Sequence, residues 1–197
     1  MIRSFIYGGE LVYPSVGAGS KIDESAQVIG DVRIGSNVLV LCCAVLRADE
    51  AWPFIIGNNV NIQDGVILHG LSGLRRTVGK IEVSVYVGED VSLAHGSIIH
   101  GSTVIGRGSF VGFGSTLHNA VIGEKVYIGH MALVMNVTIG GFRYVPHGAR
   151  ITSQKAADKL PLVTDHDMRN FNSHVVQENH LLRQKYLALD IPKAQTP

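Results

Sequence analysis

The stretch "VIGDVRIGSNVLV", residues 28–40, places an aliphatic residue at every sixth position: Val28, Ile34 and Val40. An α-helix repeats every 3.6 residues and a β-strand every two, so neither element explains this period. A solenoid with one inward aliphatic residue per short strand, and a tight corner after each strand, does have a period of six. The stretch therefore predicts a β-solenoid.

The same spacing continues in both directions along the chain. It is unbroken over residues 16–46, resumes at Ile56 and again at Val87, and continues with one-residue slips to Ile151. Three six-residue faces per coil make a triangular prism, and the stacked aliphatic side chains fill its centre. We expect an all-β solenoid domain over residues 1–160.

Two breaks in the register predict loop insertions, near residues 47–55 and 70–86. The second insertion is long enough for a loop or a small hairpin, and loops on a rigid scaffold commonly carry function. After the repeats, the spacing of apolar residues between Asp165 and Leu189 suits an amphipathic helix. We expect a C-terminal helical segment, residues 161–197, with this helix packed on the flank of the prism.

The composition argues against several classes of partner. Charged residues make up 17% of the chain and the net charge is +1, so nothing favours nucleic acid or an anionic membrane. No apolar run approaches a membrane span, and the amino terminus lacks the features of a secretory signal. The only cysteines, Cys42 and Cys43, are adjacent, which argues against a disulfide framework and leaves their role open. We expect a cytoplasmic protein.

The repeat register also stacks polar side chains. The residues that follow one set of inward aliphatics form a column of Arg47, His69, His100 and His118. Adjacent rungs of a solenoid are about 4.8 Å apart. His69 and His100 can therefore reach one common ion.

His95 lies in a different column, above Asp64. Five residues of extended chain, roughly 16 Å, separate it from His100, whereas Zn–N bonds measure about 2.0–2.1 Å. A neighbouring subunit could bring its own His95 to the His69–His100 pair, and a cyclic trimer would make three equivalent sites. Three imidazoles on zinc leave a fourth position for water, whose pKa the ion lowers to about 7. The alternative is that these histidines are ordinary polar residues on a solenoid flank.

Three segments carry a more specific signal: "RADEAWPFIIGNNVNIQDGVILHGL" (47–71), "VSLAHGSIIHG" (91–101) and "YVPHGARITSQKAADKLP" (144–161). They closely resemble the gamma-class carbonic anhydrases, a family that includes an archaeal enzyme and the amino-terminal domain of a carboxysome scaffold protein. The resemblance runs from about Ile22 to the final helix. It implies a left-handed parallel β-helix of hexapeptide repeats and a homotrimer with metal sites at the subunit interfaces.

The resemblance also assigns roles to individual residues. His69 and His100 match metal ligands from one subunit, and His95 matches the ligand from the next. It implies one divalent metal per subunit, with zinc preferred and iron(II) or cobalt as alternatives. The matched non-ligand residues are Gln63, which hydrogen-bonds the metal-bound solvent, Asn61 beside it, the proton-transfer carboxylate Glu50, the helix residue Asn179, and the interface ion pair Arg47 and Asp64.

Two departures from the family concern proton transfer. The second insertion is shorter than in the archaeal enzyme and holds Arg75 and Arg76 in place of a further glutamate, with Glu82 only on the return. Gln177 stands where the archaeal family has a tyrosine. Proton export would then be slower, or would use Glu50, His118 or buffer.

The function implied is reversible hydration of carbon dioxide to bicarbonate and a proton by a metal-bound hydroxide. One alternative is a catalytically weak scaffold or assembly protein of the same family, which would bind partner proteins. Another is a hexapeptide-repeat acyltransferase or thioesterase, which relies on a histidine base without a three-histidine metal site. The end of the sequence at Pro197, without small-subunit-like repeats, favours a stand-alone enzyme over the scaffold.

Overall fold

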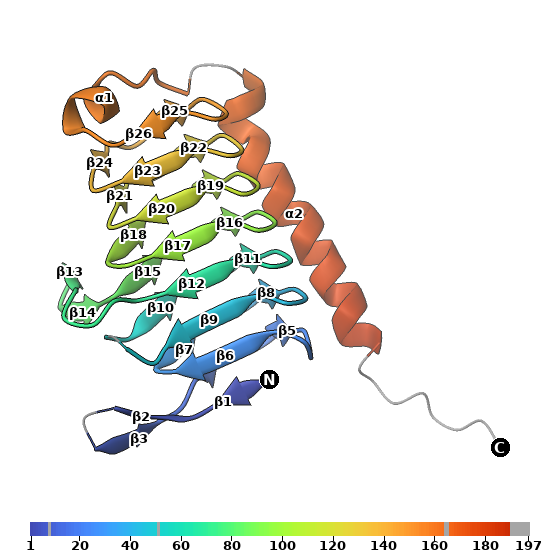
Figure 1. Cartoon of the computed structure of the whole chain (residues 1–197). Helices are drawn as coiled ribbons and strands as arrows, with labels where there is room; N and C mark the ends of the chain where they lie inside the picture. The colour runs from blue at the N-terminus through green and yellow to red at the C-terminus, as the bar shows by residue number, and fades with distance from the viewer. Residues whose placement is uncertain (8, 51, 164–165, 190–197) are drawn as a thin grey trace.

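The computed structural model describes residues 1–7, 9–50, 52–163 and 166–189. Within them the chain winds upward as a left-handed parallel β-helix whose three faces are three parallel sheets (Figure 1). This arrangement confirms the solenoid expected from the period of six.

Each face contains one short strand from nearly every coil. The first face is made of β1 (Ile2–Arg3), β6 (Gln27–Gly30), β9 (Val45–Ala48), β12 (Ile67–His69), β17 (Ile98–His100), β20 (Thr116–His118), β23 (Leu133–Met135) and β26 (Arg150–Ile151). The second face is made of β4 (Ser15–Val16), β7 (Val32–Ile34), β10 (Phe54–Ile56), β15 (Val85–Val87), β18 (Thr103–Ile105), β21 (Val121–Ile122) and β24 (Thr138–Ile139). The third face is made of β5 (Lys21–Ile22), β8 (Leu39–Val40), β11 (Asn61–Ile62), β16 (Ser92–Leu93), β19 (Phe110–Val111), β22 (Tyr127–Ile128) and β25 (Tyr144–Val145).

The core is the stack of inward aliphatic side chains. On the first face Leu46, Leu68, Ile99 and Leu117 are paired coil upon coil in that order, and all four are fully buried. Side chains on a strand alternate in direction, so the residue after each of them points away from the core. The predicted register is therefore present in the structure.

Corners of the prism require a left-handed backbone conformation. Asn37 and Asn59 occupy one such corner in successive coils, with φ values of 59° and 57°. Asparagine tolerates this region better than most residues because its short side chain can hydrogen-bond locally. At the corner, the backbone N–H of Asn59 donates to the carbonyl of Ser36 in the coil below, which fixes the stacking of the two turns.

The two register breaks lie where loops leave the prism. The first spans the connection from β9 to β10. The second contains an antiparallel hairpin of β13 (Arg76–Val78) and β14 (Ile81–Val83). A second hairpin, β2 (Phe5–Tyr7) with β3 (Glu10–Val12), and the first-face strand β1 precede the regular repeats and have no counterpart in the hexapeptide pattern.

Two helices follow the last coil: α1 (Gln154–Asp158), with Ser153 as its N-cap, and α2 (His166–Leu189). Helix α2 runs down the flank of the prism along the third face, where it contacts β5, β8 and β16 (Figure 1). This confirms the predicted C-terminal helix on the flank. No helix of the described residues is long and apolar enough to span a membrane.

The buried side of α2 differs from the apolar face expected from the sequence. Leu181 and Leu189 are 44% and 76% exposed, whereas Asn172 and Arg183 are buried. Asn172 donates to two corner carbonyls in neighbouring coils, and Arg183 donates to the carbonyl of Gly19. Corners expose backbone carbonyls that need donors, so part of the helix interface is polar.

Candidate metal centre

The histidine column, defined as Arg47, His69, His100 and His118, stands at the carboxyl ends of β9, β12, β17 and β20 on the first face. The strands place these residues directly opposite one another in successive coils. His69 Nδ1 and His100 Nε2 lie 3.2 Å apart, and His100 Nδ1 and His118 Nδ1 are also 3.2 Å apart. The column predicted from the period of six is therefore present.

The first insertion brings charge to the lower end of the column. Arg47 donates to His69 Nε2 at 2.8 Å and pairs with Asp49 and Glu50 at 3.1 and 3.6 Å. Carboxylate oxygens of Glu50 and Asp49 lie 3.5 and 3.8 Å from His69 Nε2. The potential ligand atoms of Asp49, Glu50 and His69 all lie within 4.8 Å of one another.

Electrostatics favour a neutral imidazole in the middle of the column. Burial lowers the pKa of His100, and the neighbouring His69 and His118 lower it further. Metal binding requires the neutral form of histidine. His100 is thus held in the protonation state that a metal ligand needs.

The spacing of the two inner histidines fits one shared ion. Tetrahedral zinc with Zn–N bonds of about 2.0–2.1 Å holds two donors about 3.4 Å apart. The closest nitrogens of His69 and His100 are 3.2 Å apart. Two imidazole nitrogens at this separation suit a divalent transition metal, whereas the carboxylates of Asp49 and Glu50 lie at the other ring nitrogen of His69, Nε2.

The second group of predicted site residues lies at a different corner, after β11 and β16 on the third face. His95 Nδ1 is 2.9 Å from Asp64 Oδ2, and the other Asp64 oxygen accepts a hydrogen bond from Cys42 Sγ at 2.8 Å. That hydrogen bond to the Asp64 carboxylate raises the pKa of the Cys42 thiol. The His95 side chain is half exposed, and its Nε2 has no partner among the described residues.

Asn61 and Gln63 are buried beside this pair. Asn61 Nδ2 donates to Ser92 Oγ at 2.7 Å, and Gln63 Nε2 donates to Asn61 Oδ1 at 3.3 Å. Gln63 Oε1 is buried without a hydrogen-bond partner in the part of the chain that is described. Buried polar atoms are usually satisfied, so this oxygen is an exception that the described chain does not explain by itself.

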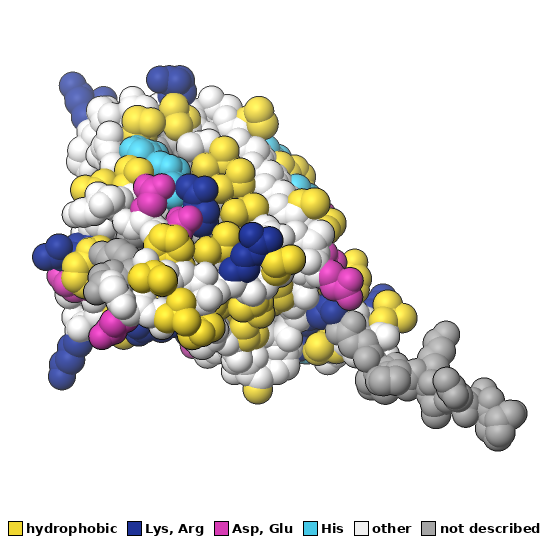
Figure 2. All heavy atoms as spheres, turned by 60° about the horizontal axis from the view of Figure 1, so that its bottom comes forward, with side chains coloured by type: hydrophobic (Ala, Val, Ile, Leu, Met, Phe, Trp, Pro, Cys, Tyr) yellow, Lys and Arg dark blue, Asp and Glu magenta, His cyan; other side chains and the backbone are white. Residues whose placement is uncertain are grey.

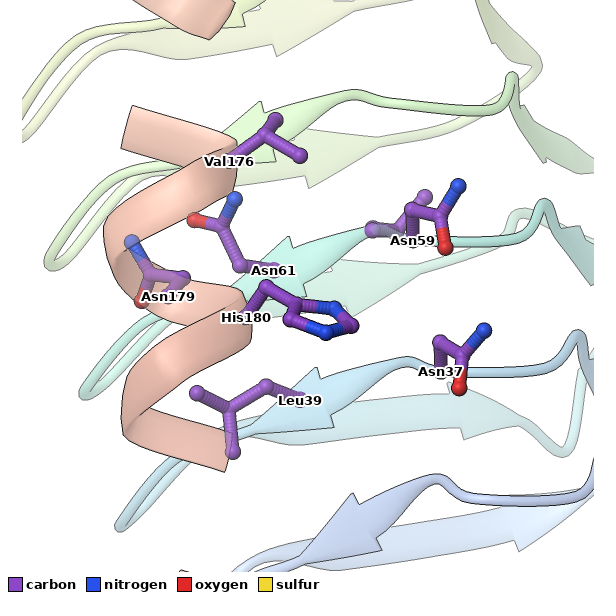
Figure 3. A pocket seen from close by; sticks show the side chains of 8 residues that line it. Asn37, Leu39, Asn59, Asn61, Val176, Asn179 and His180 are labelled. Atoms are coloured by element: carbon purple, nitrogen blue, oxygen red, sulfur yellow. The ribbon is translucent and has the colours of Figure 1, made fainter. Parts of the chain in front are cut away.

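Asn179 approaches the same region from α2. It lines a cavity of about 10 Å³ together with Asn61, and Figure 3 shows the two side chains near each other, Asn61 on the strand and Asn179 on the helix. Its Nδ2 donates to the carbonyl of Val175 one turn earlier. A cavity of this size holds about one water molecule, so Asn179 is placed to contact Asn61 through solvent.

The predicted residues therefore form two clusters in one chain. His69, His100, Arg47 and Glu50 belong to the histidine column, whereas Asn61, Gln63, Asp64, His95 and Asn179 belong to the third-face corner. Arg47 and Asp64, predicted as an interface ion pair, do not meet within the chain. Figure 2 shows histidine side chains beside acidic and basic ones on one face of the molecule.

Sequence reasoning missed Asp49, although it adjoins Glu50 in the first insertion. Its carboxylate is mostly buried and contacts both Arg47 and His69. The signal available was the pair of consecutive acids, Asp49 and Glu50, two and three residues after the column residue Arg47. His118, which the sequence offered as an alternative route for proton export, is a neighbour of His100 on the side away from His69.

Comparisons with known proteins bear on the family of the chain. No family model matches the chain. The carboxysome assembly protein CcmM of Nostoc sp. is 45% identical over 188 residues, which cover 91% of this chain and 34% of that protein. A carbonic anhydrase of Methanosarcina thermophila is 37% identical over 184 residues, which cover 88% of this chain and 74% of that enzyme. The chain thus spans about a third of the length of the carboxysome protein.

Solved structures support the fold alone. The structure of a hexapeptide transferase family protein from Anaplasma phagocytophilum superimposes with a TM-score of 0.76 at 22% identity, covering 94% of this chain and 98% of that chain. Sequence identity over most of the Methanosarcina enzyme is a stronger criterion than this likeness in fold. The chain belongs to the gamma-class carbonic anhydrase family.

Proposed function

We propose that this protein is a metal-dependent carbonic anhydrase, which interconverts carbon dioxide and bicarbonate with release of a proton. The observation that carries the proposal is the 3.2 Å approach of His69 and His100, with a third histidine, His95, presented at another corner. Support comes from the 37% identity to the Methanosarcina carbonic anhydrase.

The division into two clusters supports a homotrimer with shared sites. His69 and His100 of one subunit, with His95 of the next, would hold one divalent ion, zinc in preference to iron(II) or cobalt. Such an ion supplies a Lewis acid that makes water acidic enough to lose a proton near neutral pH. Asp64 fixes Nδ1 of His95 and so leaves Nε2 as its donor atom.

Gln63 orients the reacting solvent in this proposal. Its amide nitrogen is held by Asn61, and Asn61 is held by Ser92, so the carbonyl oxygen is fixed as an acceptor. This oxygen has no partner among the described residues. An acceptor held in place by two successive hydrogen bonds costs little reorganisation during the reaction.

Glu50 accepts the proton released by the reaction. Its side chain is 49% exposed, and one oxygen lies 3.5 Å from His69 Nε2. A carboxylate at the boundary between a site and solvent can take a proton from one side and release it on the other. Arg47, which contacts both Glu50 and His69, holds the carboxylate in this position.

A second candidate function is assembly of a larger protein complex with little catalysis. It is favoured by the 45% identity to the Nostoc carboxysome assembly protein. The two proposals differ in what the purified protein does alone. Hydration of carbon dioxide with bound metal supports the enzyme, whereas binding of shell proteins without measurable hydration supports the scaffold.

The test combines metal analysis with stopped-flow carbon dioxide hydration. We expect about one ion per chain and hydration activity in the wild type, and loss of both in His95→Ala. The matched control is His174→Ala, an exposed histidine of α2 outside both clusters, which should keep both. Full hydration activity in protein without metal contradicts the proposal.

A further inference from the structure

The second insertion forms a pocket that the proposed reaction does not use. An open pocket of about 360 Å³ lies between the base of the β13–β14 hairpin and the corners above it, on the edge of the prism that also carries α1 (Figure 1). Polar side chains dominate its lining, among them Arg75, Arg76, Ser102, Asn119, Asn136 and Gln154. None of the described residues that line it is acidic, and its volume is in the range of small-molecule sites.

Arg76 gives the pocket an uncompensated positive charge. Its Nε donates to the carbonyl of Ser102 at 2.9 Å, and its Nη2 donates to the carbonyl of Asn119 at 3.2 Å. Both acceptors are neutral, and no carboxylate pairs with Arg76 in the described part of the chain. A guanidinium has five N–H donors, so three remain available. Arg75, by contrast, donates to Glu82 at 2.7 Å.

Ser102 provides a second, independent indication of a ligand. Only 5% of this residue is exposed, and its Oγ has no hydrogen-bond partner among the described residues. Its backbone N–H donates to Asn119 Oδ1 at 2.9 Å, so its place in the pocket wall is fixed. A buried hydroxyl without a partner is uncommon in folded proteins and indicates a group supplied from outside.

We propose that this pocket binds a small oxyanion, of the carboxylate type such as bicarbonate, or phosphate. The guanidinium fork matches two oxygens of such an anion. The free N–H groups of Arg76 supply the charge, and the Ser102 hydroxyl supplies a further donor. This site is distinct from the metal centre and does not depend on the proposed function.

The pocket adjoins the histidine column through Asn119. Asn119 Nδ2 lies 3.2 Å from His118 Nε2, and His118 Nδ1 lies 3.2 Å from His100 Nδ1. An anion in the pocket is therefore separated from the column by one side chain. If the protein hydrates carbon dioxide, its product is one of the two anions that the pocket would take.

The single tryptophan reports on this pocket. Trp52 is the only tryptophan in the sequence, and Arg75 Cζ lies 4.8 Å from the centre of its ring. We would titrate the full chain with sodium bicarbonate, sodium phosphate and sodium chloride at constant ionic strength and follow Trp52 fluorescence. We expect a saturable change with bicarbonate or phosphate and none with chloride. The anion with the lower apparent Kd identifies the natural class.

Variants decide whether the response comes from the pocket. Arg76→Gln should raise the apparent Kd about tenfold or more, because it removes charge-assisted hydrogen bonds. Arg33→Gln is the matched control, since Arg33 is an exposed arginine of strand β7 paired with Asp31, and it should keep the wild-type curve. No saturable change in the wild type, or an Arg76→Gln curve identical to wild type, overturns the proposal.

Ser102→Ala covers the case in which Arg76→Gln does not fold. This substitution deletes a hydroxyl without a partner and leaves both Arg76 contacts to backbone carbonyls in place. We expect a wild-type circular dichroism spectrum and a weaker fluorescence response to the anion. If Arg76→Gln is misfolded and Ser102→Ala has an unchanged Kd, the anion site is refuted.

Discussion

Asp64 should set the metal affinity although it is not a proposed ligand. Its Oδ2 lies 2.9 Å from His95 Nδ1, so it fixes the ring and directs Nε2 outward. Loss of such a supporting hydrogen bond typically weakens metal binding 10–100-fold, which corresponds to about 1.4–2.7 kcal/mol. We therefore expect Asp64→Ala to weaken zinc binding by roughly this factor while the other two proposed ligands remain in place.

The assay is competition for zinc with a chelator of known affinity, together with light scattering to establish that the variant keeps the oligomeric state of the wild type. Asp31→Ala is the matched control, because Asp31 pairs with Arg33 and contacts no histidine. Cys42→Ala removes the other partner of Asp64 and should leave zinc affinity within about threefold of wild type, because the bond to His95 remains. An Asp64→Ala variant with wild-type affinity would refute the role of Asp64 in orienting His95.

Three further predictions address proton transfer, pH and the core. Glu50→Gln should lower carbon dioxide hydration about tenfold or more in dilute buffer, with recovery in concentrated imidazole buffer; equal loss in both buffers would contradict proton transfer by Glu50. His130 Nδ1 accepts a hydrogen bond from the backbone N–H of Phe113 at 3.0 Å. Burial lowers the pKa of His130 below 6.5, and the neighbouring His147 lowers it further. The folded protein therefore binds a proton at His130 less readily than the unfolded chain does. The contribution of neutral His130 to the free energy of unfolding should therefore be fully present above pH 6.5 and fall as the pH decreases through 6.5 toward the pKa of the folded state. Urea unfolding at pH 7.5 and 5.5 should show a smaller loss of unfolding free energy in His130→Gln than in wild type. Leu68→Ala, at a fully buried core position, should cost about 2–5 kcal/mol of unfolding free energy, whereas Ile81→Ala on the exposed hairpin should cost about 0.5 kcal/mol or less; equal costs would contradict the assignment of the core.

The core and the histidine column followed from spacing alone, for a simple physical reason. In a β-helix the rungs stack directly, so residues at equal positions in successive coils become neighbours. The period of six therefore predicted that Leu68 pairs with Ile99, and that His69 pairs with His100. Few folds convert sequence position into spatial position so directly.

Spacing could not give the face of α2 or the contacts of the insertions. Apolar periodicity assumes that the helix packs on an apolar surface. The corners of the prism instead present backbone carbonyls, to which Asn172 and Arg183 donate hydrogen bonds. Asp49 reaches His69 only because its loop folds back over the first face. The orphan oxygen of Gln63 likewise depends on which neighbours bury it.

The most direct test of the shared metal centre is complementation between two inactive variants. His69→Ala lacks a ligand in the column, and His95→Ala lacks the ligand at the corner. In trimers mixed at random from equal amounts of both, about a quarter of the interfaces join an intact column to an intact corner. We predict that each variant alone binds little zinc and hydrates little carbon dioxide, and that the co-refolded mixture recovers about a quarter of the wild-type zinc content and activity. A mixture no more active than the separate variants would contradict a site built from two subunits.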